Sequence, residues 1–185
     1  MPALTRRTIE HTRSMVYIAL FAVLMAVCAW ISVPAVVPFT MQIFAVFLAV
    51  SVLGGRRGTL AVLIYILMGI VGMPVFSHFQ GGLGVLFQAN GGYILGFLLA
   101  ALVMWATESI AGQRIWIRIL SMLLGLLVCY AVGTAWFMVL YAQANQTIGL
   151  GAALLWCVIP YVIPDLVKLA LALTLSRRLR TALKL

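Results

Sequence analysis

The stretch IPYVIPDLVKLALALTL, residues 159–175, decides the fold of this chain. It is almost entirely apolar and long enough to cross the hydrocarbon core of a bilayer as a helix. It contains Asp165, the only aspartate of the chain, and Lys168, one of its two lysines. Charges at membrane depth are costly, so they face a bundle interior or a cavity and pair with each other. The stretch therefore predicts a membrane-spanning helix that carries a polar site.

The rest of the chain is equally apolar. Hydrophobic residues make up 65% of the 185 residues and charged residues 8%, and the mean hydropathy is +1.20. A soluble domain has roughly a quarter charged residues. Only helices and closed barrels satisfy their backbone within lipid, and no alternating strand pattern is present. We therefore predict an all-α integral membrane protein, with residues 1–185 forming a single membrane domain.

Six apolar stretches are separated by short connections, which predicts a six-transmembrane-helix bundle. The second stretch is short for a full crossing. The expected spans are about Ser14–Val33, Phe39–Leu53, Thr59–Phe76, Gly91–Ile110, Arg118–Tyr141 and Ala152–Leu175.

Basic residues fall in every second connection between these spans. The net charge of +9 is therefore a sign of membrane topology and not of nucleic-acid binding. Because basic residues favour the cytoplasmic side, both termini are expected in the cytoplasm. The residues concerned are Arg6, Arg7, Arg13, Arg56, Arg57, Arg114, Arg118, Arg177, Arg178, Arg180 and Lys184.

A polar face is expected on the last span. Steps of four and three residues place Tyr161, Asp165 and Lys168 on one side of a helix. A carboxylate accepts hydrogen bonds and an ammonium donates them, so the pair suits a neutral polar ligand. Two alternatives remain: an ion pair that only fixes helix packing, or a Lys168 side chain that extends toward the cytoplasmic interface.

Three further polar residues are candidates for the same site. Asn90 stands where a glycine-rich connection enters the fourth span, with Tyr93 three residues further on. Asn90 also suits an N-cap position, which is the alternative for it. Gln42 lies at the start of the second span, where it either faces the site or is a polar residue at the interface.

Small residues recur at four-residue spacing in two spans. Ala22 and Ala26 form such a pair in the first span, and Gly92 and Gly96 form one in the fourth. These pairs let helices approach closely. Packing within the bundle is the expected role of the glycines, and an intramolecular role is the alternative to partner docking for the alanines.

Enzyme motifs are missing from the sequence. There is no phosphate-binding loop, no HExxH and no GxSxG motif, and the three carboxylates are too few for a metal-dependent phosphotransferase. The three cysteines form no CxxC pair. We therefore expect no catalytic residues, no metal site and no cofactor.

Several segments together resemble one family. The chain is similar to BioY proteins, the substrate-capture (S) components of energy-coupling-factor transporters for biotin. The matching segments are VPFTMQ (37–42), GMPVF (72–76), GGLGVLF (81–87), NGGYILGF (90–97) and PDLVK (164–168).

This resemblance implies a ligand and partners. Biotin would be captured from outside the cell, with Asn90, Asp165 and Lys168 as ligand-binding residues. An S component docks through small residues of its first span, here Ala22 and Ala26, on a transmembrane coupling protein that carries two ATPase subunits. An S component for another vitamin, a small membrane enzyme and a structural subunit are the alternatives.

Overall fold

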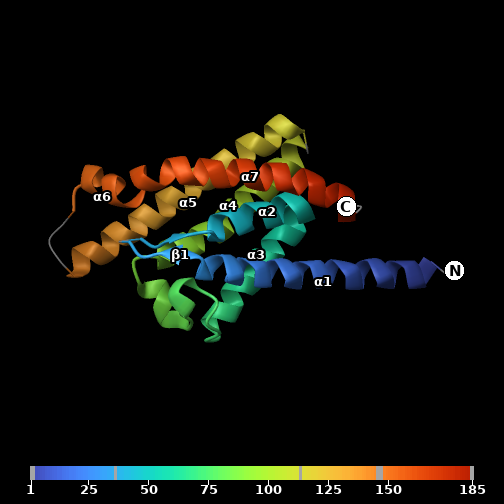
Figure 1. Ribbon diagram of the computed structural model, residues 1–185, viewed down its shortest axis with the longest axis horizontal. Helices are drawn as coiled ribbons and strands as arrows, with labels where there is room; N and C mark the ends of the chain where they lie inside the picture. Colours follow the sequence, from blue (N-terminus) through green and yellow to red (C-terminus); the bar gives the residue numbers. More distant parts are fainter. Residues whose placement is uncertain (1–2, 36, 113, 145–147, 184–185) are drawn as a thin grey trace.

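The computed structural model describes residues 3–35, 37–112, 114–144 and 148–183. These residues form an elongated helix bundle (Figure 1). The described elements are α1 (Ala3–Trp30), β1 (Ser32–Val33), β2 (Phe39–Thr40), α2 (Gln42–Leu53), α3 (Gly55–Ile70), η1 (Ser77–Phe79), η2 (Leu83–Phe87), α4 (Gly91–Ala111), α5 (Ile115–Ala144), α6 (Leu150–Cys157) and α7 (Ile159–Leu183).

Four helices are long and apolar enough to cross a membrane. They cover Thr8–Trp30, Gly91–Ala111, Ile115–Gln143 and Ile159–Leu183. The short second span of the sequence prediction is α2, whose 12 residues are nearly all buried. It packs against α1, α3, α4 and α7, so it is shielded from lipid by other helices. The prediction of a membrane-embedded helical fold is thus confirmed at the level of these four helices.

The predicted sixth helix is divided into two, so that the described residues contain seven α-helices and not six. The break falls at Val158, between α6 and α7. Pro160 follows two residues later, and its nitrogen has no hydrogen to donate to the carbonyl of Trp156 one turn earlier. Pro164 removes a second such bond inside α7, next to Asp165.

The beginning of α1 and the end of α7 lie at the same end of the bundle (Figure 1). The Arg13 guanidinium donates a hydrogen bond to the Leu183 carbonyl across this end. We call it the terminal end. The opposite end carries the β1–β2 pair, in which Ser32 lies opposite Thr40 and Val33 opposite Phe39.

Glycines let α4 and α5 pack closely. A Cβ atom on Gly92 would lie 2.2 Å from the Cβ of Trp136, and one on Gly96 would lie 3.1 Å from the Cα of Cys129. The expected role of these glycines in packing within the bundle is confirmed.

The alanine pair of α1 is also inside the bundle. Ala22 and Ala26 are only 0% and 3% exposed, whereas Leu20 and Val23 on the other face are more than half exposed. This burial favours the intramolecular alternative for the two alanines. Their contact with a partner stays a prediction.

Candidate functional site

The described residues enclose a cavity at the end of the bundle opposite the terminal end. All six residues predicted for the site lie on its wall, and its free volume is about 50 Å³. The lining residues are Val37, Pro38, Phe39, Thr40, Gln42, Ile43, Ser77, Asn90, Tyr93, Ile94, Phe97, Tyr130, Cys157, Tyr161, Asp165 and Lys168. Ligand pockets generally measure about 300–1,000 Å³, so this cavity is smaller than a typical ligand pocket.

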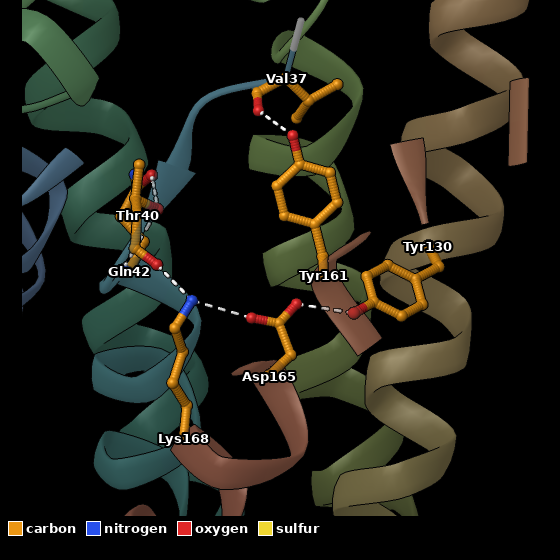
Figure 2. A network of polar contacts seen from close by, with 7 residues as sticks. All are labelled: Val37, Thr40, Gln42, Tyr130, Tyr161, Asp165 and Lys168. Atoms are coloured by element: carbon orange, nitrogen blue, oxygen red, sulfur yellow. Dashed lines mark hydrogen bonds and ion pairs between the residues drawn. The ribbon is translucent and has the colours of Figure 1, made fainter. Parts of the chain in front are cut away.

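The ion pair of α7 lies at the centre of the wall. Lys168 Nζ is 2.8 Å from Asp165 Oδ1, and only 5% of the lysine side chain and 7% of the aspartate side chain are exposed. Pro164 directly precedes Asp165, and Lys168 lies about one helical turn further along α7. The Lys168 side chain is directed into the bundle, so the alternative in which it extends to the interface is wrong (Figure 2).

Tyr130 of α5 completes the surroundings of Asp165. Its hydroxyl donates to Asp165 Oδ2 over 2.7 Å, so both carboxylate oxygens have a partner (Figure 2). Sequence reasoning missed this residue. An aromatic residue within an apolar span is typical of a packed core, and a separation of 35 residues from Asp165 carries no periodic signal.

Two side chains of α7 hold the segment that precedes α2. Lys168 Nζ donates to the carbonyl oxygen of Thr40 over 2.7 Å, and the Tyr161 hydroxyl donates to that of Val37 over 2.6 Å. Figure 2 shows both bonds reaching from α7 to this segment. Residues 37–40 are therefore fixed over the cavity by the same helix that carries the ion pair.

Phe39 adds aromatic contacts between the same two elements. Lys168 Nζ lies 3.7 Å from the centroid of the Phe39 ring, a cation–π contact. The ring also stacks on Tyr161, with the two centroids 6.1 Å apart. The Lys168 ammonium is thus surrounded by a carboxylate, a carbonyl and an aromatic face, which compensates for its removal from water.

Gln42 is a buried member of the cavity wall, at 5% exposure. Its Oε1 accepts from the Thr40 hydroxyl over 3.0 Å, and its Nε2 donates to the hydroxyl of Tyr65. Tyr65 in turn donates to the Val75 carbonyl over 3.1 Å. The alternative of an interfacial polar residue is therefore wrong for Gln42.

Asn90 takes the N-cap position of α4 but makes no capping hydrogen bond with its side chain. Its Nδ2 donates instead to the Ser77 hydroxyl over 3.3 Å, a long bond. The amide is therefore weakly held at the cavity wall. Tyr93 also lies on the wall, and its hydroxyl donates a hydrogen bond to the Cys157 carbonyl over 3.2 Å.

The cavity suits hydrogen bonding rather than bond cleavage. Asp165 and Lys168 are the charged residues among its described lining, and they neutralise each other. Within the described residues no cluster of three His, Cys, Asp or Glu is placed to hold a metal ion. Amides, hydroxyls and this pair face apolar rings, an arrangement that complements an uncharged polar group attached to an apolar body.

The fold and the cavity define a multi-pass membrane protein with a buried polar site. The BioY family model matches residues 3–185, and the chain belongs to the BioY family. It is 38% identical to "Biotin transporter BioY" of Thermotoga maritima over 169 residues, which cover 91% of this chain and 96% of that protein. It is 39% identical to "Probable biotin transporter BioY" of Pyrococcus horikoshii, over 88% of this chain and 93% of that one.

The fold has a solved counterpart. The crystal structure of the S-component for biotin from an ECF-type ABC transporter superposes with a TM-score of 0.81. It covers 93% of both chains at 22% sequence identity, and so establishes that the two share a fold.

Proposed function

We propose that this chain is the biotin-binding S component of a vitamin transporter in the plasma membrane, with both termini in the cytoplasm. It captures biotin from outside and mediates its uptake, without being an enzyme itself. The polar cavity built around Asp165 and Lys168 carries this proposal, since its hydrogen-bond donors and acceptors complement those of biotin. The names of the two curated relatives point to the same ligand.

The ureido ring of biotin has two N–H donors and one carbonyl acceptor. In the proposed complex Asp165 accepts from an N–H, and Asn90 donates to the carbonyl with the amide that is now only weakly bound to Ser77. Phe39, Tyr93 and Tyr161 supply aromatic walls for the thioether ring. Gln42 and Lys168 complete the donors and acceptors around the ligand.

Binding requires the cavity to enlarge, because its free volume of about 50 Å³ is too small for a vitamin. The segment of residues 37–40 is the part that moves in this proposal. Its described contacts are the bonds of Lys168 and Tyr161, the stacking of Phe39, the short pairing with β1 and the bond of the Thr40 hydroxyl to Gln42. All of these are side-chain contacts or a two-residue pairing.

Energy for uptake comes from partners in this proposal. The sequence has no phosphate-binding loop, so ATP hydrolysis is assigned to two ATPase subunits joined through a transmembrane coupling protein. Docking through α1 is part of the proposal. The burial of Ala22 and Ala26 means that the partner contacts the exposed face of α1, or that α1 shifts on docking.

Calorimetric titration of biotin into the detergent-purified chain tests the ligand, with thiamine as the control vitamin. Saturable binding of one biotin per chain and no heat from thiamine are expected. A folded chain that binds thiamine and not biotin would move the assignment to another vitamin. A folded chain that binds neither would favour a purely structural ion pair.

A further inference from the structure

A second feature of the surface lies at the far end of α2 and α4 from the cavity. Gln42 begins α2 and Leu53 ends it, and a helix of 12 residues spans roughly 18 Å. Beyond Leu53 the chain turns through Gly54 into α3, where Arg56 and Arg57 are both exposed. These arginines lie beside the last turns of α4 and have no part in the cavity.

An apolar groove runs between α3 and α4 from this point. It has a free volume of about 370 Å³, several times that of the cavity. Leu60 and Leu102 on its walls are 41% and 39% exposed. The described residues that line it are Arg56, Thr59, Leu60, Leu63, Leu98, Leu102 and Trp105.

A polar recess of about 390 Å³ adjoins the charged end of the groove. Arg56 and Trp105 line both, so the two spaces are adjacent. Arg57 and Ser109 belong to the recess, together with the carboxylate of Glu108. With two guanidinium groups and one carboxylate, the recess keeps a net positive charge.

Close packing keeps the recess in shape. A Cβ atom on Gly55 would lie 2.6 Å from the Cα of Trp105, so the start of α3 touches the α4 backbone. The Glu108 carboxylate accepts a hydrogen bond from the Gly55 amide. Glu108 is thus engaged at the start of α3, where a negative charge is favourable, and the arginine side chains remain exposed.

We propose that the groove and recess together bind one anionic phospholipid. The phosphate lies between Arg56 and Arg57, and an acyl chain lies along the leucines between α3 and α4. One guanidinium group can bind two phosphate oxygens through two parallel hydrogen bonds. Basic recesses between membrane helices are known to bind lipid head groups. Tryptophan is typical of the head-group level, where Trp105 would lie. An apolar groove that ends in positive charge complements an amphipathic anion.

Lipid-dependent thermal stability of the purified full-length chain tests this site. The probes are phosphatidylglycerol, phosphatidylcholine with the same acyl chains, and inorganic phosphate. Phosphatidylglycerol is expected to raise the melting temperature by about 5 °C at saturation, with little effect from the other two. Native mass spectrometry should then show one retained phosphatidylglycerol per chain.

A matched pair of variants locates the effect. Arg56→Gln/Arg57→Gln should lose the shift, while Arg177→Gln/Arg178→Gln should keep it, because that second exposed arginine pair lies on α7 and lines neither space. Equal losses in both variants would reduce the effect to general surface charge and overturn the site. An undiminished rise in melting temperature in the Arg56→Gln/Arg57→Gln variant would also overturn the site. Equal stabilisation by phosphatidylcholine would do the same.

A third variant covers the case in which removal of the arginines prevents folding. Leu102→Trp fills the groove and leaves both arginines and the start of α3 unchanged. It should reduce the phosphatidylglycerol shift at least by half. A full rise in melting temperature in this variant would overturn the placement of the acyl chain. Biotin titration of each variant is the control that the cavity is intact.

Discussion

The two ends of the bundle carry charge in opposite ways. At the terminal end Arg56, Arg57, Arg177 and Arg178 are exposed. At the cavity end the ion pair of α7 is almost fully buried, and each member has a second hydrogen-bond partner.

The difference shows what burial demands of a charged group. An exposed arginine is solvated by water and head groups, so its position along the chain matters more than its geometry. A buried ion pair has lost that solvation and is stable only when further hydrogen bonds replace it. Substitutions at the cavity end should therefore have much larger effects than those at the terminal end.

The largest effect is expected from Asp165→Asn. The amide keeps the shape of the side chain but leaves the Lys168 charge without its carboxylate and removes an acceptor for the ligand. We expect biotin affinity to fall about 100-fold or more, equivalent to roughly 3 kcal/mol. Titration calorimetry measures this, and Arg178→Gln at the terminal end is the control with unchanged affinity. Equal affinity of Asp165→Asn and the native chain would remove Asp165 from the binding site.

Lys168→Met should have the next largest effect, because it breaks the bond to the Thr40 carbonyl. A hydrogen bond from a charged group contributes about 1.5–3 kcal/mol, so residues 37–40 should open at least tenfold more often. Cys157 lines the cavity at 1% exposure and is a natural probe of opening. We expect its alkylation by a maleimide to accelerate by about tenfold.

Cys28 and Cys129 provide the internal control for that experiment. Both are buried, and neither is part of the cavity wall. Their alkylation should stay slow in Lys168→Met if only residues 37–40 are released. Acceleration at all three thiols would mean general loosening of the fold, and unchanged labelling of Cys157 would show that Lys168 does not hold the segment.

The helix packing between the two ends gives a third prediction. Gly92→Ala introduces a methyl group 2.2 Å from the Cβ of Trp136, so α4 and α5 must separate. We expect a loss of about 1–3 kcal/mol in the free energy of unfolding, seen as a lower melting temperature. Gly84→Ala is the matched control, since its added methyl group meets no described atom within 4 Å. If both variants melt alike, close packing at Gly92 does not limit stability.

Local spacing explains which parts of this structure the sequence could predict. Tyr161, Asp165 and Lys168 share one helix, so steps of four and three residues placed them together correctly. The break at Val158 was missed, although Pro160 was visible, because an apolar run alone does not distinguish one helix from two. The contact of Tyr130 with Asp165 depends on how α5 packs against α7, which no pattern along the chain reports.

Tyr130→Phe gives the smallest effect and tests the contact that the sequence did not reveal. The change removes one hydroxyl that donates to Asp165 Oδ2 and keeps the ring in place. We expect biotin affinity to fall about fivefold to tenfold, since Asp165 keeps its bond to Lys168. Tyr141→Phe is the control, because the Tyr141 hydroxyl makes no hydrogen bond within the described part of the chain.

In the double variant Tyr130→Phe/Asp165→Asn the loss of biotin affinity should be smaller than the sum of the two single losses, because both changes act on one hydrogen-bonded unit. Strict additivity would instead mean that Tyr130 acts on the ligand directly and not through Asp165.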